Sequence, residues 1–132
     1  MNCFIPKNSK FKKYFLITYK NMSYKSYKLI FGNIGFKSIV SGYLTSKQLV
    51  LIKKIFSKKL KKIGLFWIKV YPFFNVTKKP AEVRMGRGKG NVHEWVCPIR
   101  IGQIVFEFKN ISRKDVNDLY KICNNKYLYY LK

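Results

Sequence analysis

Apolar positions recur at the spacing of β-strands in four parts of the chain, namely residues 29–40, 65–71, 94–101 and 104–109. Gly32 and Gly35 punctuate the first of these strands and predict a bend or bulge there. The second strand ends at Pro72, and Gly102 with Gln103 predicts a tight turn between the last two. The residues that we expect to face the core are Phe66, Ile68, Val70, Ile104, Phe106 and Phe108.

Two other segments have the spacing of amphipathic helices. Thr45 and Gln48 match a capping box, in which the two side chains satisfy free backbone N–H groups at a helix start. One side of this helix is apolar and the opposite side is basic, and Gly64 stands where a C-terminal cap is expected. The apolar residues are Leu49, Ile52, Phe56, Leu60 and Ile63, and the basic residues are Lys47, Lys54, Lys58, Lys61 and Lys62. Ser112 and Asp115 predict the start of a second helix, with the apolar stripe Val116, Leu119, Tyr120 and Cys123.

The order strand, helix, strands, helix predicts an α+β fold, most simply an antiparallel β-sheet with two helices packed on one face as a two-layer sandwich. The chain of 132 residues is long enough for one core, and it has no internal repeat and no linker. Residues 1–28 are basic, rich in Tyr and weakly periodic, so we expect an extended basic N-terminal arm followed by a single domain at 29–132. A targeting peptide is the alternative for 1–28, but this segment lacks arginine and a clear helical stripe.

Charge identifies the class of partner. The formal net charge is +23, of which +20 falls in residues 1–90, and so lopsided a charge normally requires a polyanion or an anionic membrane surface. The hydrophobic fraction of 48% and the aromatic fraction of 17% argue against intrinsic disorder. The longest uncharged stretch, Ser38 to Ser46, is far shorter than the ~20 apolar residues that span a bilayer. Nucleic acid is therefore the predicted partner.

The sequence contains no recognisable catalytic or metal-binding set. Three widely spaced cysteines and one histidine suggest neither a disulfide framework nor a zinc site, and we expect Cys97 and Cys123 to be buried apolar residues. The candidate acids and bases are Glu82, His93, Glu94, Glu107, Asp115 and Asp118, and nothing in their spacing brings them together. We expect Glu107 and the two aspartates to be surface partners of lysines. The prediction is a protein without enzymatic activity, cofactor, metal or small-molecule substrate.

The segment 78–95 is the most distinctive stretch. Its glycines alternate with cations, so the backbone can approach a phosphate chain while Arg84 and Arg87 fork onto phosphate and Lys89 acts as a point charge. The G-x-G-x-G spacing fits neither a P-loop nor a dinucleotide-binding fingerprint. The alternative is a flexible glycine-rich hairpin connection with solvated charges.

Two further features have open alternatives. The lysine side of the first helix is either a solvated surface or, as we favour in the absence of acids on that side, a row of phosphate contacts. Trp67 and Tyr71, beside Lys69, either stack on bases or pack against the arm.

Several blocks of the chain closely resemble the large-subunit ribosomal protein L-sixteen family (universal uL-sixteen). They are PKNSKFKK at 6–13, FGNIGFKSIVSGYLTSKQ at 31–48, GLFWIKVYP at 64–72, TKKPAEVRMGRGKGNVHEWV at 77–96 and GQIVFEF at 102–108. The resemblance implies an α+β sandwich bound to large-subunit rRNA near the passage of tRNA, with neighbouring ribosomal proteins and without independent catalysis. In the family, the arginine matching Arg84 is a hydroxylation site in bacterial members.

Resemblance and charge together predict two sets of binding residues. The predicted rRNA-binding residues are Lys7, Lys10, Lys12, Lys13, Lys47, Lys54, Lys58, Lys61, Lys62, Lys69, Lys78 and Lys79. The resemblance implies a loop near tRNA made of Arg84, Met85, Gly86, Arg87, Gly88, Lys89 and Gly90, with Arg84 as a possible modification site. A general nucleic-acid-binding or compacting basic protein is the alternative function.

Composition bears on the compartment. Phe, Tyr, Ile, Asn and Lys make up just over half of the residues and Ala81 is the single alanine, which indicates an AT-rich gene of the kind that organellar genomes often carry. The family match begins close to Met1, so we expect no cleaved presequence. These features favour synthesis inside an organelle, most simply a mitochondrion, with a plastid or the bacterial cytoplasm as alternatives. The chain departs from the family in its aromatic, lysine-based arm at 15–28 and its short C-terminus at 125–132.

Overall fold

The computed structural model describes residues 4–11, 13–23, 25–61, 63–86 and 88–126, with side chains as far as residue 123. Its elements in chain order are β1 (Ile34–Lys37), β2 (Gly42–Thr45), α1 (Ser46–Leu60), β3 (Leu65–Ile68), β4 (Phe74–Lys78), β5 (Asn91–Ile99), β6 (Ile104–Lys109) and α2 (Arg113–Lys126). All strand pairs are antiparallel, and they form two three-stranded sheets with the orders β1-β6-β3 and β2-β5-β4.

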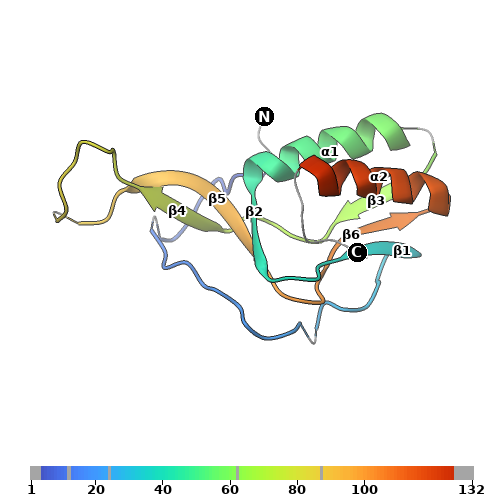
Figure 1. Ribbon diagram of the computed structural model, residues 1–132, viewed down its shortest axis with the longest axis horizontal. Helices are drawn as coiled ribbons and strands as arrows, with labels where there is room; N and C mark the ends of the chain where they lie inside the picture. The colour runs from blue at the N-terminus through green and yellow to red at the C-terminus, as the bar shows by residue number, and fades with distance from the viewer. Residues whose placement is uncertain (1–3, 12, 24, 62, 87, 127–132) are drawn as a thin grey trace.

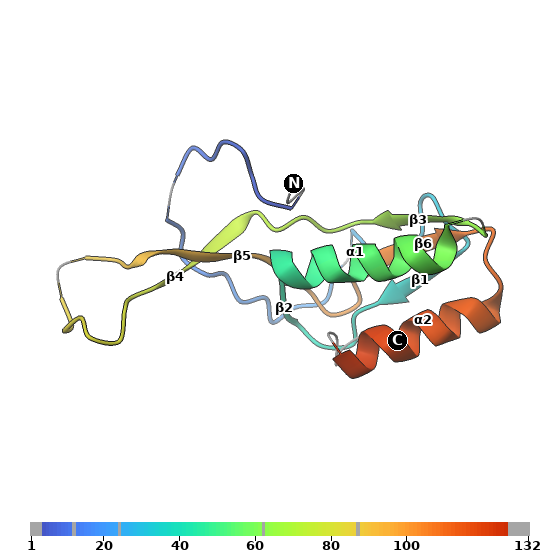
Figure 2. The ribbon, with the colours of Figure 1, turned by 90° about the horizontal axis from the view of Figure 1, so that it is seen from above.

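The core lies between the two helices and the β1-β6-β3 sheet. Helices α1 and α2 lie side by side over one face of this sheet (Figures 1 and 2). Phe56 of α1 packs edge-on against Phe106 and Phe108 of β6, with ring centroids 5.2 and 5.3 Å apart. The predicted α+β class and the packing of both helices on one face are confirmed. The strands divide into two sheets, and the second sheet continues away from the helices as the β4–β5 hairpin (Figure 1).

Helix α1 begins where its local sequence predicts. The Gln48 backbone N–H donates to Thr45 Oγ1 at 3.2 Å and the Thr45 N–H donates to Gln48 Oε1 at 2.9 Å, which completes the capping box. The predicted apolar stripe is buried at Leu49, Ile52, Phe56 and Leu60. Ile63 is 53% exposed, contrary to prediction, because the helix ends at Leu60. Lys61 forms the C-cap, and Gly64 instead allows close packing, since a Cβ there would lie 2.7 Å from the Lys109 carbonyl oxygen.

The predicted strand at 29–40 is wrong over two thirds of its length, because only residues 34–37 pair as β1. Before β1, the backbone N–H groups of residues 30–32 donate to the buried Glu107 carboxylate instead of to a neighbouring strand. After β1, the Ser38 hydroxyl donates to the Val40 carbonyl at 2.6 Å and the chain turns, leaving Ile39 and Val40 about half exposed. The strand does contain an irregularity, but the register shift lies between Phe36 and Lys37 and not at Gly32 or Gly35, where the bend or bulge was predicted.

The second sheet contains two strands that sequence reasoning did not predict. Residues 42–45 lie outside the four predicted strands, but they pair with β5 as β2. Residues 74–78 form β4. Because β4 pairs with β5 as far as Asn91, β5 begins three residues before its predicted start. Asn75 of β4 is buried and its Oδ1 accepts from the Tyr14 backbone N–H at 3.2 Å.

Among the described residues before β1, no helix or strand occurs, and this segment runs extended over the body of the molecule. Phe4 is buried, the Ser23 N–H donates to the Ile101 carbonyl at 2.8 Å, and the Ile104 N–H donates to the Ser26 carbonyl at 2.9 Å. The division between an arm and a domain at residues 28 and 29 stays a prediction.

Candidate nucleic-acid interface

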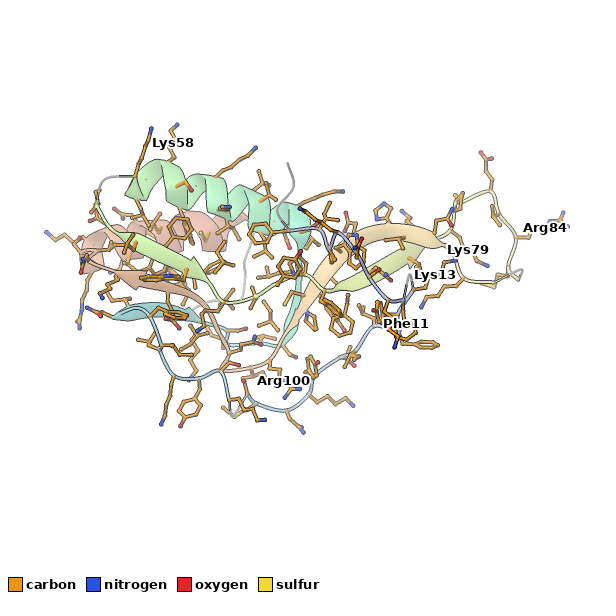
Figure 3. All side chains as sticks on the ribbon, turned by 180° about the vertical axis from the view of Figure 1, so that it is seen from behind. Phe11, Lys13, Lys58, Lys79, Arg84 and Arg100 are labelled. Atoms are coloured by element: carbon orange, nitrogen blue, oxygen red, sulfur yellow. The ribbon has the colours of Figure 1, made fainter. Side chains whose placement is uncertain are left out.

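The β4–β5 hairpin carries the glycine-rich loop, residues 79–90, to one end of the long axis of the molecule (Figures 1 and 3). Arg84 and Met85 are exposed at the tip. Gly86 and Gly88 have φ angles of 107° and 84°, a left-handed backbone that L side chains rarely adopt. The tip therefore requires glycine at these two positions. Arg87 lies outside the described residues.

The arm holds the base of this loop. The Lys13 Nζ donates to the Lys89 carbonyl at 2.7 Å, and the Lys89 Nζ donates in return to the Tyr14 carbonyl at 2.5 Å. The Lys89 ammonium also lies 4.7 Å from the centroid of the Phe15 ring, and the Lys79 Nζ donates to the Gly86 carbonyl at 2.5 Å. The loop is thus fastened at its base, and its tip projects beyond the fastened part (Figure 3).

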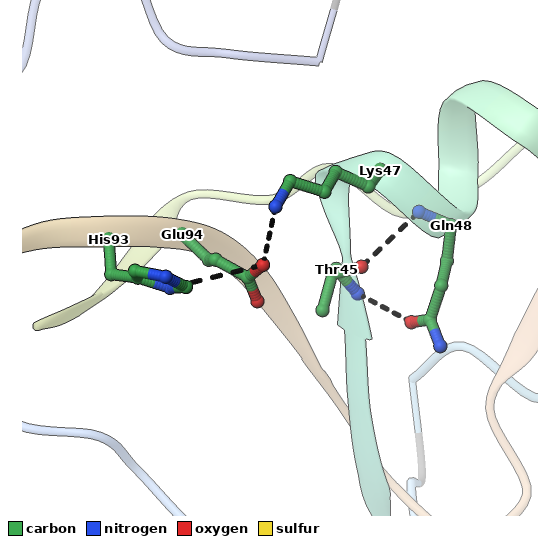
Figure 4. A network of polar contacts seen from close by, with 5 residues as sticks. All are labelled: Thr45, Lys47, Gln48, His93 and Glu94. Carbon is green, nitrogen blue, oxygen red and sulfur yellow. Dashed lines mark hydrogen bonds and ion pairs between the residues drawn. The ribbon is translucent and has the colours of Figure 1, made fainter. Parts of the chain in front are cut away.

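The basic side of α1 is exposed as predicted, but its lysines differ in whether they have an acidic partner. Lys54, Lys58 and Lys61 are exposed, and no acidic side chain within the described part of the chain lies at ion-pair distance from them. Lys47 differs because its Nζ lies 2.8 Å from Glu94 Oε1 of β5 (Figure 4). The hydrogen bond from Lys47 is the main cause that lowers the pKa of Glu94. Lys62 lies outside the described residues.

The buried carboxylate of Glu107 engages Lys69. Its Oε1 lies 3.3 Å from the Lys69 Nζ, and the Glu107 side chain is 0% exposed. The expectation that Glu107 is a surface partner of lysine is therefore wrong, because residues 30–32 cover this face of β6 and donate three backbone N–H groups to the carboxylate. The Lys69 side chain is only 19% exposed, and its role in rRNA binding stays a prediction.

Trp67 and Tyr71, for which the sequence allowed either base stacking or packing against the arm, both contact the N-terminal part of the chain. The Trp67 ring stacks on Phe31 with centroids 5.8 Å apart, and the Lys69 ammonium lies 4.6 Å from the same Phe31 ring. The Tyr71 ring lies 6.4 Å from that of Phe4 and remains 44% exposed. Packing against the predicted arm at 1–28 therefore describes Tyr71, whereas Trp67 packs on Phe31, just after that arm.

The remaining predicted cations are spread over the molecule. Lys7, Lys10 and Lys13 are exposed on the arm, Lys78 is exposed at the end of β4, and Lys12 lies outside the described residues. Lys58 on α1 and Arg84 on the loop lie at opposite ends of the long axis (Figure 3). Most of the predicted residues that the structure describes thus lie in two regions, the helix surface and the hairpin with the adjacent arm, and Lys69 lies in neither.

Other chemistry finds little support in the described residues. They contain no group of three His, Cys, Asp or Glu side chains able to hold a metal ion. Burial raises the pKa of the Cys97 and Cys123 thiols to about 11 each, so both are protonated at neutral pH, and their predicted burial is confirmed. His93 Nδ1 lies 3.9 Å from Glu94 Oε1, but Lys47 already engages that carboxylate (Figure 4). None of the described helices is both long and apolar enough to cross a bilayer.

Sequence reasoning did not single out one cationic residue that the structure places beside the arm. The Arg100 guanidinium lies 4.0 Å from the centroid of the Tyr19 ring. Arg100 precedes the turn at Gly102, and no local pattern pairs it with a residue 81 positions earlier. Contacts of this kind depend on the course of the arm, which periodicity does not predict.

Comparison with known proteins now identifies the family. The profile of ribosomal protein L16p/L10e matches residues 6–127. The large ribosomal subunit protein uL16 of Thioalkalivibrio sulfidiphilus is 36% identical over 121 residues, covering 92% of this chain and 88% of that protein. The same protein of Chlamydia caviae is 40% identical over 86% of this chain and 83% of its own length, and uL16m of Prototheca wickerhamii is 33% identical over 92% and 90%. The chain belongs to the ribosomal protein L16p/L10e family.

Proposed function

We propose that this chain is a structural component of the large subunit of an organellar ribosome, where it binds large-subunit rRNA and supports translation. The observation that carries the proposal is the pair of exposed cationic regions on one folded scaffold, in a chain with a net charge of +23 and family membership over residues 6–127. Lysines without acidic partners suit phosphate groups, because phosphate contacts dominate the affinity of proteins for nucleic acids.

The helix surface and the arm have one task in this proposal, and the tip of the loop has another. The lysines of α1 and the arm bind rRNA phosphates and fix the orientation of the protein, since phosphate contacts carry position but little sequence information. The loop at 84–90 reaches toward tRNA, with Arg84 at its exposed tip. The base of the loop, fastened by Lys13 and Lys89, keeps the tip at a defined place. The family is one of structural ribosomal proteins, so we assign no catalytic activity and no cofactor.

A mitochondrion is the compartment that we propose. The codon bias implied by the composition supports an organellar gene, and the mitochondrial-type relative uL16m of Prototheca wickerhamii supports an organellar assignment. Bacterial relatives reach similar identity, so the bacterial cytoplasm is the competing compartment. A tagged copy that fractionates with purified mitochondria would support the organellar assignment.

The variant Arg84→Ala tests the task of the loop. We expect the variant to enter large subunits at the level of the original chain, because Arg84 lies at the exposed tip and no hydrogen bond or ion pair ties its side chain to the described residues. Translation should fall severalfold, measured as incorporation of labelled amino acids per assembled subunit. Arg113→Ala, on the exposed start of α2, is the matched control and should leave translation unchanged. Loss of Arg84→Ala from subunits would make the loop an assembly contact and contradict this part of the proposal.

A further inference from the structure

A hollow of about 390 Å³, open on one side, lies between the arm and the turn after β5. Its lining includes Tyr19, Ser23, Lys25, Ser26, Arg100 and Gln103. Backbone hydrogen bonds fix the two walls together, because Ser23 donates to the Ile101 carbonyl and Ile104 donates to the Ser26 carbonyl. Gln103 Oε1 accepts a hydrogen bond from the Arg100 backbone N–H at 3.0 Å. This bond holds the backbone of Arg100 in place.

The lining combines a flat surface with positive charge. The Arg100 guanidinium lies 4.0 Å from the Tyr19 ring centroid, so the two groups form a cation–π contact. Lys25 is exposed at the same hollow, and the hydroxyls of two serines and the amide of Gln103 add hydrogen-bonding groups. Over the described ranges, neither Lys25 nor Arg100 has an acidic side chain at ion-pair distance. The guanidinium plane suits a planar ring, and the two cations suit an anionic group.

We propose that this hollow binds one unpaired nucleotide of RNA, with the base stacked on Arg100 and the phosphate beside Lys25. The inference rests on the proposed function as an rRNA-binding protein and adds a site to it. Unstacked bases in RNA loops are commonly held on aromatic rings or guanidinium planes. The volume falls within the range of roughly 300–1,000 Å³ that small-ligand sites occupy. The open side of the hollow leaves room for the flanking nucleotides, whereas a base within a duplex has no free face to stack.

A short single-stranded probe tests the site, because it is too small to bridge the distant cationic regions. Fluorescence-labelled uridine trinucleotide is titrated into the full chain and, in parallel, into Arg100→Lys and Tyr19→Leu, which keep the charge of the site but remove the guanidinium plane or the ring. We expect each variant to lose about tenfold in affinity. Tyr19→Phe keeps the ring and should bind as the original chain does. Lys109→Gln, which removes an exposed cation elsewhere, should cost less than about twofold.

Two further measurements decide what the hollow recognises. A trinucleotide whose central base is absent should bind the original chain about tenfold more weakly. Ultraviolet cross-linking of the uridine probe, followed by peptide mass spectrometry, should map the cross-link to a peptide that lines the hollow, namely one that contains Tyr19, Lys25 or Arg100. Equal binding of the abasic probe, or a cross-link confined to the loop at 79–90, would overturn the proposal in favour of phosphate contacts alone.

The outcome is separable from that of the proposed function. If the variants sediment with large subunits as the original chain does but bind the trinucleotide equally well, the nucleotide site is wrong while the ribosomal role stands. Matching thermal unfolding of Arg100→Lys, Tyr19→Leu and the original chain excludes a general loss of structure. If the original chain itself does not sediment with large subunits, the proposed function fails first.

Discussion

At the scale of the residue, Glu107 links the segment before β1 to the central strand of the core sheet. Its carboxylate accepts the backbone N–H groups of Phe31 at 2.6 Å, Gly32 at 3.0 Å and Ile30 at 3.2 Å, and lies 3.3 Å from the Lys69 Nζ. Burial opposes its ionisation, but these hydrogen bonds outweigh burial and lower the pKa of Glu107. The anionic form is therefore part of the folded structure.

Glu107→Gln should destabilise the fold by about 3 kcal/mol, because an amide presents N–H donors to a site made of donors and leaves Lys69 without its counter-charge. The measurement is urea-induced unfolding at neutral pH. Glu94→Gln is the matched control, since it breaks an ion pair in which the Lys47 side chain is 72% exposed. The control should cost less than about 1 kcal/mol. Equal effects of the two substitutions would contradict the structural role of Glu107.

The stability difference between the original chain and Glu107→Gln should depend on pH, and the pKa of Glu107 sets the sign of this dependence. Since the pKa of Glu107 is lowered from 4.5 on folding, its ionisation stabilises the fold at pH values above 4.5. This contribution is lost as the pH falls through the lower pKa of the folded state. The difference in unfolding free energy between the original chain and Glu107→Gln should therefore be largest near neutral pH and shrink under acid conditions.

At the scale of the element, local signals were reliable where they depend on a few neighbouring residues. The capping box at Thr45 and Gln48 places the start of α1, and the apolar stripe as far as Leu60 is buried. The strand predicted at 29–40 is too long, because three of its backbone N–H groups donate to Glu107. The burial of Glu107 depends on the tertiary fold. Strand β4 was missed because its buried position is the polar Asn75, and because the loop at 79–90 separates it from its partner β5.

The exposed lysines of α1 can be tested as one element. Lys54→Gln with Lys58→Gln should weaken the binding of large-subunit rRNA and reduce the slope of log affinity against log salt by roughly 1.4 to 1.8, since each lost phosphate contact removes about 0.7 to 0.9. The measurement is filter binding of an rRNA fragment over a series of salt concentrations. Lys114→Gln with Lys121→Gln removes the same charge from α2 and is the control. An unchanged slope in the α1 variant, or an equal change in the control, would make the α1 surface merely solvated.

At the scale of the whole molecule, an extended arm and a long hairpin distribute the net charge of +23 over a scaffold with one apolar core. The exposed tip of the loop, with Arg84 and Met85, was predictable because glycine-rich segments between strands project from the fold. The ion pair of Lys69 with the buried Glu107 and the contact between Tyr19 and Arg100 were not predictable. Both depend on where the extended chain before β1 crosses the sheets, and that segment has no periodicity that would set its course.

Sedimentation shows whether this chain is a component of the large ribosomal subunit. Detergent-solubilised mitochondria are separated on a sucrose gradient at moderate salt, and the chain is followed by mass spectrometry beside known proteins of both ribosomal subunits. We expect the chain to migrate with the large subunit and to stay there through a high-salt wash, because many phosphate contacts hold it. A peak at the top of the gradient, or with the DNA, would contradict the ribosomal role and favour a general nucleic-acid-binding protein.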